Sequence, residues 1–224
     1  MPSFSRFSTA AALAALLVAL TGCTPGGPAR PDPADIVRDY LAALAEGDAA
    51  TARAIDSEAV SETLGSNTDA DGLRTDAVLG AAETISNIRI EARTTPADAE
   101  STRVGFSYDL AGETRQGSLA VAWDSEAGEW ELAEPFTLDL GVNAVVSSIE
   151  IEPVPFTIGE TPVELGGAPD EAPIFHLVYP GVYTITADID PATVTDGEGL
   201  TRTVVAVPPD GVEVDYRVSR LPSS

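Results

Sequence analysis

Few side chains in this sequence have the chemistry of a catalytic base or nucleophile. The chain has one histidine, His176, in the apolar run from Ile174 to Val178. A catalytic triad requires a histidine as its general base, but such neighbours indicate a strand, so we interpret His176 as a surface-facing or hydrogen-bonded strand residue. The sequence contains no Gly-x-Ser-x-Gly turn and no glycine-rich phosphate loop. We therefore predict that the protein is not an enzyme.

An acidic stretch from Asn67 to Gly72 has part of the spacing of a calcium loop. The EF-hand loop takes oxygen ligands at positions 1, 3 and 5, a glycine at 6 and an acid at 12. Asn67, Asp69, Asp71 and Gly72 match the first four positions, but position 12 is Val78. Because the bidentate acid is missing, we interpret the stretch as an exposed loop, with Asn67, Asp69 and Asp71 as weak candidates for metal ligands.

The single cysteine has the most specific surroundings in the chain. Residues 9–20 form an almost unbroken apolar run, which is typical of a signal segment and too short to span a bilayer comfortably. The run leads into Leu20, Thr21, Gly22 and Cys23, and these residues resemble the lipobox of bacterial lipoproteins. The resemblance implies cleavage before Cys23 and thioether lipidation of its sulfur, and two acyl chains are what stable anchoring requires.

Composition narrows the possible functions. The 224 residues include 36 acidic and 12 basic ones, all arginine, for a net charge of -24. This charge excludes nucleic acid as a partner, because a phosphate backbone would be repelled. One cysteine excludes an intrachain disulfide, and one cysteine with one histidine excludes the common Cys/His zinc sites. We expect no cofactor.

The sequence predicts a tethered chain of two domains. A Pro/Gly-rich stretch after Cys23 is typical of a flexible linker. The expected parts are a signal peptide over 1–22, the lipidated cysteine and linker over 23–32, a first domain over 33–136 and a second domain over 138–221.

The first domain shows a change from helical to strand periodicity. Asp32 and Pro33 predict a helix that ends at Gly47, a typical C-cap residue. Asp48 predicts the start of a second helix, and a third helical patch is expected over 73–82. Apolar residues then alternate with polar ones, which predicts four antiparallel strands over 88–92, 104–110, 119–123 and 130–132.

Helices followed by such a sheet resemble the nuclear transport factor 2-like (cystatin-like) cone, with the best local matches at 36–48 and 128–132. The resemblance implies an α+β fold. Some cones of this superfamily host enzymes that use a Tyr and Asp pair in an apolar cavity, and the available residues are Tyr40, Tyr108 and Asp109. Because Tyr108 and Asp109 should point to opposite faces of their strand, we interpret the two tyrosines as packing residues.

The second domain is predicted to be an all-β, sandwich-like unit. Short strand-like runs punctuated by proline and glycine extend through it. The run Tyr179, Pro180, Gly181, Val182, Tyr183 predicts a tight turn. It is similar to β-modules in the teicoplanin-resistance-associated membrane proteins. The whole fold expected is thus N-terminal helices on a four-stranded cone sheet, followed by a β-domain.

These patterns favour a non-enzymatic binding or scaffolding module, anchored through Cys23 at the outer face of the cell membrane. Its expected partners are the membrane and an unknown envelope protein or cell-wall component. One alternative is a small-molecule-binding protein or enzyme that uses the cone cavity, and another is sequestration of cations by the acidic surface. A deep pocket with a facing acid and tyrosine favours the enzyme, whereas a filled cone favours the scaffold.

Overall fold

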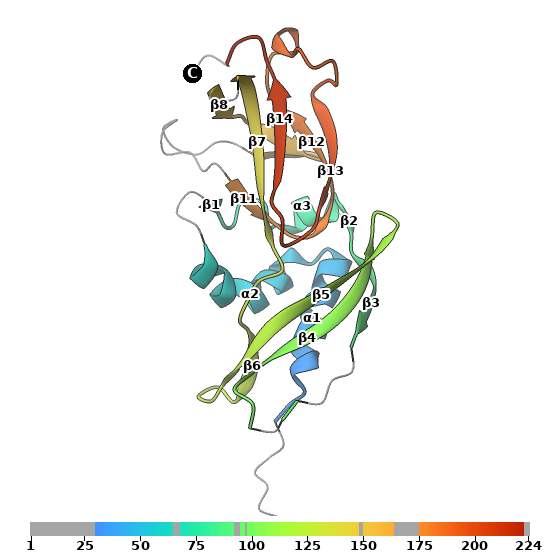
Figure 1. Cartoon of the computed structure of the whole chain (residues 1–224), viewed down its shortest axis with the longest axis vertical. Coiled ribbons are helices and arrows are strands. Elements are labelled where there is room, and N and C mark those ends of the chain that lie inside the picture. The colour runs from blue at the N-terminus through green and yellow to red at the C-terminus, as the bar shows by residue number, and fades with distance from the viewer. Residues whose placement is uncertain are drawn as a thin grey trace, which may run out of the picture.

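Two lobes follow one another along the long axis of the molecule (Figure 1). The structure is a computed structural model, and it describes residues 30–64, 68–91, 95–96, 98–147, 150–163 and 175–221. Of these residues, 46% lie in strands and 22% in helices, and the strands form three sheets. The predicted fold class, an α+β cone followed by an all-β domain, is therefore wrong, because strands predominate over helices and form three sheets.

The lower lobe begins with two helices, α1 (Pro33–Glu46) and α2 (Ala49–Thr63). The Asp32 carboxylate accepts the Ala34 N–H at 2.9 Å, and Gly47 ends α1 with a φ of 77°, which a glycine adopts without steric cost. Asp48 caps α2 in turn. The predicted bounds of the first helix are thus confirmed. Of the described helices, none has the length and apolar character needed to cross a membrane.

An antiparallel sheet packs against these helices in the lower lobe. Its strands pair in chain order, which confirms the predicted meander: β3 (Ser86–Ile90), β4 (Ser101–Leu110), β5 (Glu113–Asp124) and β6 (Glu129–Leu132). Alternate residues of β4 and β5 are buried, because one face of the sheet is covered and the other faces water.

Aromatic rings fill the space between the helices and this sheet. Phe136, from the segment after β6, contacts Phe106 and Tyr108 edge to face, with ring centroids 5.3 and 5.6 Å away. All three side chains are buried. Because large rings in this geometry pack densely, the space between the helices and the sheet is filled at this position.

The upper lobe consists of two sheets around a second hydrophobic core. The first sheet joins β1 (Thr68–Asp69), β11 (Phe175–Val178), β7 (Leu138–Ser147) and β14 (Val212–Arg217) in that order, with β8 (Glu150–Pro153) also paired to β7. The second joins β10 (Thr161–Val163), β9 (Phe156–Ile158), β12 (Gly181–Ala187) and β13 (Thr201–Ala206), with β2 (Glu83–Thr84) also paired to β12. A 3-10 turn, η1 (Pro191–Thr193), precedes β13. Sequence analysis did not predict β7.

The segment from β1 to β2 belongs to the first half of the chain but completes the upper lobe. Its helix, α3 (Asp76–Gly80), has only five residues, although a longer helical patch was expected over 73–82. Strands β1 and β2 pair with β11 and β12 of the upper lobe, and Leu73 and Val78 are buried in the upper core. Tyr179, from the end of β11, packs in the lower core instead. Each lobe is completed by a segment from the other half of the chain.

Substitutions at two glycines of the lower sheet test how tightly the space between the helices and the sheet is packed. A Cβ at Gly117 would lie 2.7 Å from Cζ of Phe106, whereas a Cβ at Gly105 would meet only the carboxylate of the exposed Glu91. We expect Gly117→Ala to destabilise the fold by about 1–3 kcal/mol through overpacking. The matched change Gly105→Ala should be neutral or slightly stabilising, because Glu91 can turn away and alanine loses less backbone entropy than glycine. Equilibrium urea unfolding measures both, and equal effects would contradict a filled cone.

Candidate functional site

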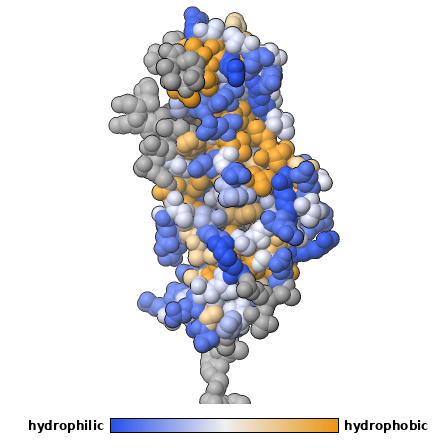
Figure 2. Space-filling view, viewed as in Figure 1, coloured by the Kyte–Doolittle hydropathy of each residue, from blue (hydrophilic) through white to orange (hydrophobic). Residues whose placement is uncertain are grey.

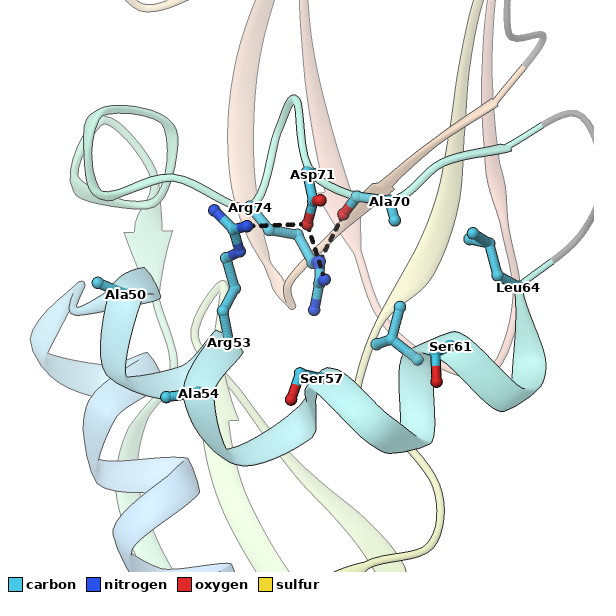
Figure 3. Close-up of a pocket in the computed structure, with 10 residues that line it drawn as sticks. Ala50, Arg53, Ala54, Ser57, Ser61, Leu64, Ala70, Asp71 and Arg74 are labelled. Carbon is cyan, nitrogen blue, oxygen red and sulfur yellow. Dashed lines mark hydrogen bonds and ion pairs between the residues drawn. The ribbon is translucent and has the colours of Figure 1, made fainter.

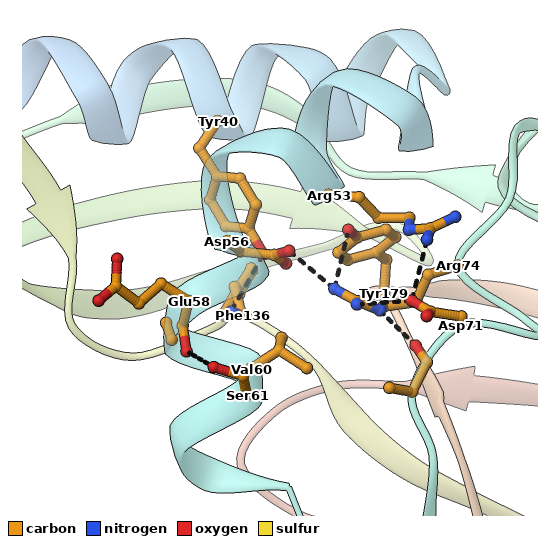
Figure 4. Close-up of polar contacts among 12 residues, drawn as sticks. Tyr40, Arg53, Asp56, Glu58, Val60, Ser61, Asp71, Arg74, Phe136 and Tyr179 are labelled. Carbon is orange, nitrogen blue, oxygen red and sulfur yellow. Dashed lines mark hydrogen bonds and ion pairs between the residues drawn. The ribbon is translucent and has the colours of Figure 1, made fainter.

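The charged residues most deeply buried in the described part of the chain are Asp56 and Arg74, which are 0% and 3% exposed. Asp56 lies on α2, and Arg74 lies in the loop that follows β1. Tyr40 of α1 and Tyr179 at the end of β11 complete a group of four, here called the junction network (Figure 4). It lies where the two lobes meet.

Every polar end in the junction network has a partner. The Arg74 guanidinium donates through Nη1 to Asp56 Oδ1 at 2.7 Å, and the Tyr40 hydroxyl donates to Asp56 Oδ2 at 2.9 Å. The Tyr40 oxygen accepts the Phe136 N–H at 3.2 Å. Arg74 also contacts the Tyr179 hydroxyl at 3.4 Å. The Asp56 carboxylate is thereby held from both oxygens (Figure 4).

The remaining donors of Arg74 are bound by its own loop. Its Nε donates to the Ala70 carbonyl at 2.6 Å, and its Nη2 donates to the Asp71 carboxylate at 3.2 Å. The guanidinium also lies 5.7 Å from the centre of the Tyr179 ring. Arg74 therefore connects α2, its own loop and the end of β11 through a single side chain.

Burial and charge oppose one another in this network. Burial raises the pKa of Asp56, and the nearby Arg74 charge together with hydrogen bonds from both tyrosines offsets only part of that rise, so the net shift is upward. Burial lowers the pKa of Arg74, but the charges of Asp56 and Asp71 and the hydrogen bond to Asp56 outweigh it, so the net shift is upward. Burial and the Asp56 charge raise the pKa of Tyr40. Asp56 and Arg74 are thus held as an ion pair with neutral tyrosines beside it.

A surface groove lies between α2 and the loop that follows β1, next to the network (Figure 3). Its volume is about 510 Å³, and small residues of α2, such as Ala54 and Ser57, form one wall. Arg53 and Arg74 both contact the Asp71 carboxylate at the opposite wall, at 3.0 and 3.2 Å. Asp56 does not line this groove. The buried acid is therefore separated from the nearest open space by Arg74.

The chemistry of the junction network fits a structural role. A general acid or base needs to reach a substrate, but both oxygens of Asp56 already accept hydrogen bonds and the Tyr40 oxygen accepts the Phe136 N–H. The facing acid and tyrosine that an enzyme of this kind needs are present, yet without an open pocket between them. The arrangement joins α1, α2, the loop after β1 and the end of β11.

The weak metal candidates already have protein partners. Asn67 lies outside the described residues. The Asp69 carboxylate accepts the backbone N–H groups of Asp71 and Gly72, and Asp71 binds the two arginines that border the groove. A Cβ at Gly72 would lie 2.2 Å from Asp69 Oδ2, so the glycine has a steric reason of its own. Across the described ranges, no three His, Cys, Asp or Glu side chains gather as metal ligands.

His176 is a buried, hydrogen-bonded strand residue, as one of the two predicted interpretations stated. It is 3% exposed, and its Nδ1 lies 3.3 Å from the Asp69 carboxylate. Its ring stands edge-on to Phe156 at 5.7 Å. The contact between His176 and Asp69 links β11 to the neighbouring strand β1. His176 therefore helps to hold the start of the loop that carries Arg74.

The predicted tyrosine and aspartate candidates are not brought together as a group. Tyr108 is buried in the cone, whereas Asp109 faces solvent and accepts hydrogen bonds from Asn87 and Thr114. Their opposite directions confirm the prediction from strand alternation. Tyr40 is buried as expected, but its partner is Asp56. Leu20, Thr21, Gly22 and Cys23 lie outside the described residues.

Sequence analysis missed Asp56 and Arg74, and only one of them left a signal. The buried residues of α2 include Ala52, Asp56 and Ala59, so Asp56 falls on the inward stripe of a predicted helix. A lone acid at such a position requires a buried cation or hydrogen-bond donors. No pattern in the sequence identifies Arg74 as that cation, because its loop has no periodicity.

The ion pair makes a testable contribution to stability. We expect Asp56→Asn to lower the free energy of unfolding by about 3–5 kcal/mol, because it leaves Arg74 buried without its countercharge. Combining Asp56→Asn with Arg74→Met should cost less than the two single changes added together, since no unpaired charge remains. Urea unfolding of the three variants measures this coupling.

The matched control is Asp39→Asn on the exposed face of α1. It removes the same charge from a helix without breaking a buried pair, and we expect a change within about 0.5 kcal/mol. If Asp56→Asn cost no more than Asp39→Asn, or if the two network changes were simply additive, the structural role of the pair would be refuted.

The buried histidine predicts a pH dependence. Burial lowers the pKa of His176, and Asp69 only partly opposes this, so the unfolded chain binds the proton more readily. Stability is therefore complete above the unfolded pKa of about 6.5 and is lost as pH falls below it, by at most about 1.4 kcal/mol per pH unit. His176→Gln should lose less stability than the parent between pH 7.5 and 5.5. Equal losses in both proteins would contradict this assignment.

No family model, curated protein or solved structure matches the chain. The resemblances to nuclear transport factor 2-like domains and to teicoplanin-resistance-associated proteins therefore stay predictions. The function is inferred from the residues of this chain.

Proposed function

We propose that the protein is a lipid-anchored extracytoplasmic envelope protein, attached through Cys23, which acts as a non-enzymatic binding or scaffolding module. The observation that carries the proposal is the point at which the chain enters the fold. The blue segment that leads into α1 starts at the free end of the lower lobe, and the upper lobe forms the other end of the long axis (Figure 1). An anchor at Cys23 would therefore turn the upper lobe away from the membrane.

Specific contacts hold this entry point in position. The Arg30 guanidinium stacks over Trp123, 4.5 Å from the ring centre, and donates to the Ala99 carbonyl. The Trp130 indole N–H donates to the Pro31 carbonyl at 2.9 Å. The two tryptophans contact each other edge to face. These contacts fix the start of the fold against the lower sheet, so an anchor at Cys23 would hold the lower lobe in a restricted orientation.

The net negative charge of the chain favours a folded part that is held away from the membrane surface. Without residues 1–22, which include one arginine, the chain has 11 basic and 36 acidic residues and a net charge of -25. Anionic lipid headgroups repel such a surface. A Pro/Gly-rich linker between Cys23 and the fold, extended at about 3.1 Å per residue, separates the two.

The filled cone and the junction network support the non-enzymatic part of the proposal. Phe136 occupies the space where the alternative, an enzyme or small-molecule binder, would need a cavity. The Asp56 carboxylate is bound by Arg74 and Tyr40. The network instead stiffens the junction between the tethered lobe and the distal one, which suits a module that presents a surface.

The anchor is tested by replacing Cys23 with serine in the organism that makes the protein. We expect the parent to incorporate a labelled fatty acid and to sediment with membranes, and Cys23→Ser to lose the label because the oxygen is not a substrate for thioether formation. Thr24→Ser is the matched control at the neighbouring position and should keep the label. An unlabelled parent, or equal labelling of Cys23→Ser, would refute lipid anchoring.

A further inference from the structure

Strand β13 forms an open edge of the upper lobe. It is the last strand of its sheet and pairs on one side with β12. Among the described residues, no strand pairs with its other side, and no backbone hydrogen bond reaches it from outside that pairing. Alternate residues of this six-residue strand thus present unpaired N–H and C=O groups at the open side, which are a template for another strand.

The other sheet edges carry features that hinder strand addition. Charged side chains, proline, irregular register and short length all protect an edge. Charged residues lie on β14 (Glu213, Asp215 and Arg217), β6 (Glu129 and Glu131) and β8 (Glu152). Proline lies on β10 (Pro162) and on β8 (Pro153). Strand β3 has a register shift, and β1 and β2 have only two residues each. Of the described edges, β13 combines length with the least protection.

The side chains of β13 make its edge electrically neutral. Thr201, Thr203 and Val205 are exposed, with Val205 at 41%. The one charged residue, Arg202, turns over the Tyr216 ring and forms ion pairs with Asp196, at 2.6 Å, and with Glu198. Figure 2 shows apolar surface in the part of this face where Figure 1 has β13 and β2. A neutral edge of this kind is unusual on a chain with a net charge of -24.

Acidic residues lie in the chain on either side of this neutral edge. Before β13, Asp196 and Glu198 both pair with Arg202, so this end has two acids for one arginine, and the exposed Asp210 follows the strand. A second copy of the chain would bring its own negative charge to the same place, whereas a strand with basic ends would meet opposite charge at both ends. Charge complementarity therefore selects a foreign, basic-ended strand over a second copy.

We infer that β13 is a docking edge for an extended segment of a partner protein, uncharged over the length of β13 and basic at both ends. The segment would add to the sheet through main-chain hydrogen bonds, with alternate side chains beside Thr203 and Val205, as in other cases of β-strand addition. The inference rests on the proposed binding role and names its partner by chemistry. It does not depend on the lipid anchor.

The probe is a synthetic nonapeptide of alternating threonine and valine with a lysine at each end. It is titrated against the chain from residue 23 onward carrying Cys23→Ser, with binding followed by fluorescence anisotropy and by amide hydrogen exchange. We expect saturable binding that slows exchange in β13. Val205→Lys and Thr203→Lys should each weaken binding by about tenfold or more, because a charge on the edge repels a basic strand.

Matched controls separate strand addition from general attraction. Gln116→Lys makes the same charge change at an exposed position of β5 in the other lobe, and we expect binding to stay within about twofold of the parent, since the site is remote. A peptide with proline at the central valine should bind at least about tenfold more weakly, because it lacks a ladder donor. Thermal unfolding shows that each variant is folded.

Three outcomes would overturn the inference. The first is absence of saturable binding, and the second is equal binding of the proline peptide, which would indicate charge alone. The third is protection of β13 that rises with protein concentration without peptide, which would make a second copy the occupant. Because the assay uses Cys23→Ser in solution, its failure leaves the anchoring result unaffected, and loss of anchoring leaves this result unaffected.

Discussion

The ion pair between Arg74 and Asp56 constrains the whole structure more than any other contact. Removing two charges from water costs several kcal/mol for each ion unless geometry and further hydrogen bonds compensate. The compensation comes from Tyr40, Tyr179 and the Asp71 carboxylate, which belong to separate elements. All of them have to assemble together, so the pair sets how α1, α2, the loop before α3 and the end of β11 meet.

The exchange of segments between the lobes follows the same constraint. The loop that carries Arg74 begins at β1 and leads into α3 and β2, which complete the upper lobe. Conversely, Tyr179 follows β11 of the upper lobe but packs in the lower core. Because each lobe contains a part of the other, the lobes are expected to unfold as one cooperative unit and to behave as one rigid body. A rigid body is what a tethered binding module requires.

The distribution of charge bears on both the proposed anchor and the proposed docking edge. Acidic residues cover a surface that has few arginines, and several of those arginines are used internally, as Arg74 and Arg202 are. Long-range repulsion keeps such a body away from anionic lipid and from its own copies. The neutral edge of β13 is then the place where a complementary strand can approach closely.

Local patterns in the sequence determined the helices and the meander of the lower lobe. Asp32 and Gly47 act through hydrogen bonds and backbone angles within one turn of α1, and strand alternation separates Tyr108 from Asp109. Such signals depend on neighbours along the chain, so spacing is enough to read them. The strand β7 had a similar alternation in Leu138, Leu140, Val142 and Ala144, which sequence analysis overlooked.

Only the tertiary structure decided which distant segments meet. Strand β1 has two residues and no periodicity, and its pairing with β11 joins positions more than a hundred residues apart. Arg74 and Asp56 are 18 residues apart in elements of different kinds, so no spacing rule links them. The sequence by itself therefore determined the local elements and the position of the single cysteine. The lobes, the junction network and the open edge arose from long-range packing, whose energy depends on the whole chain at once.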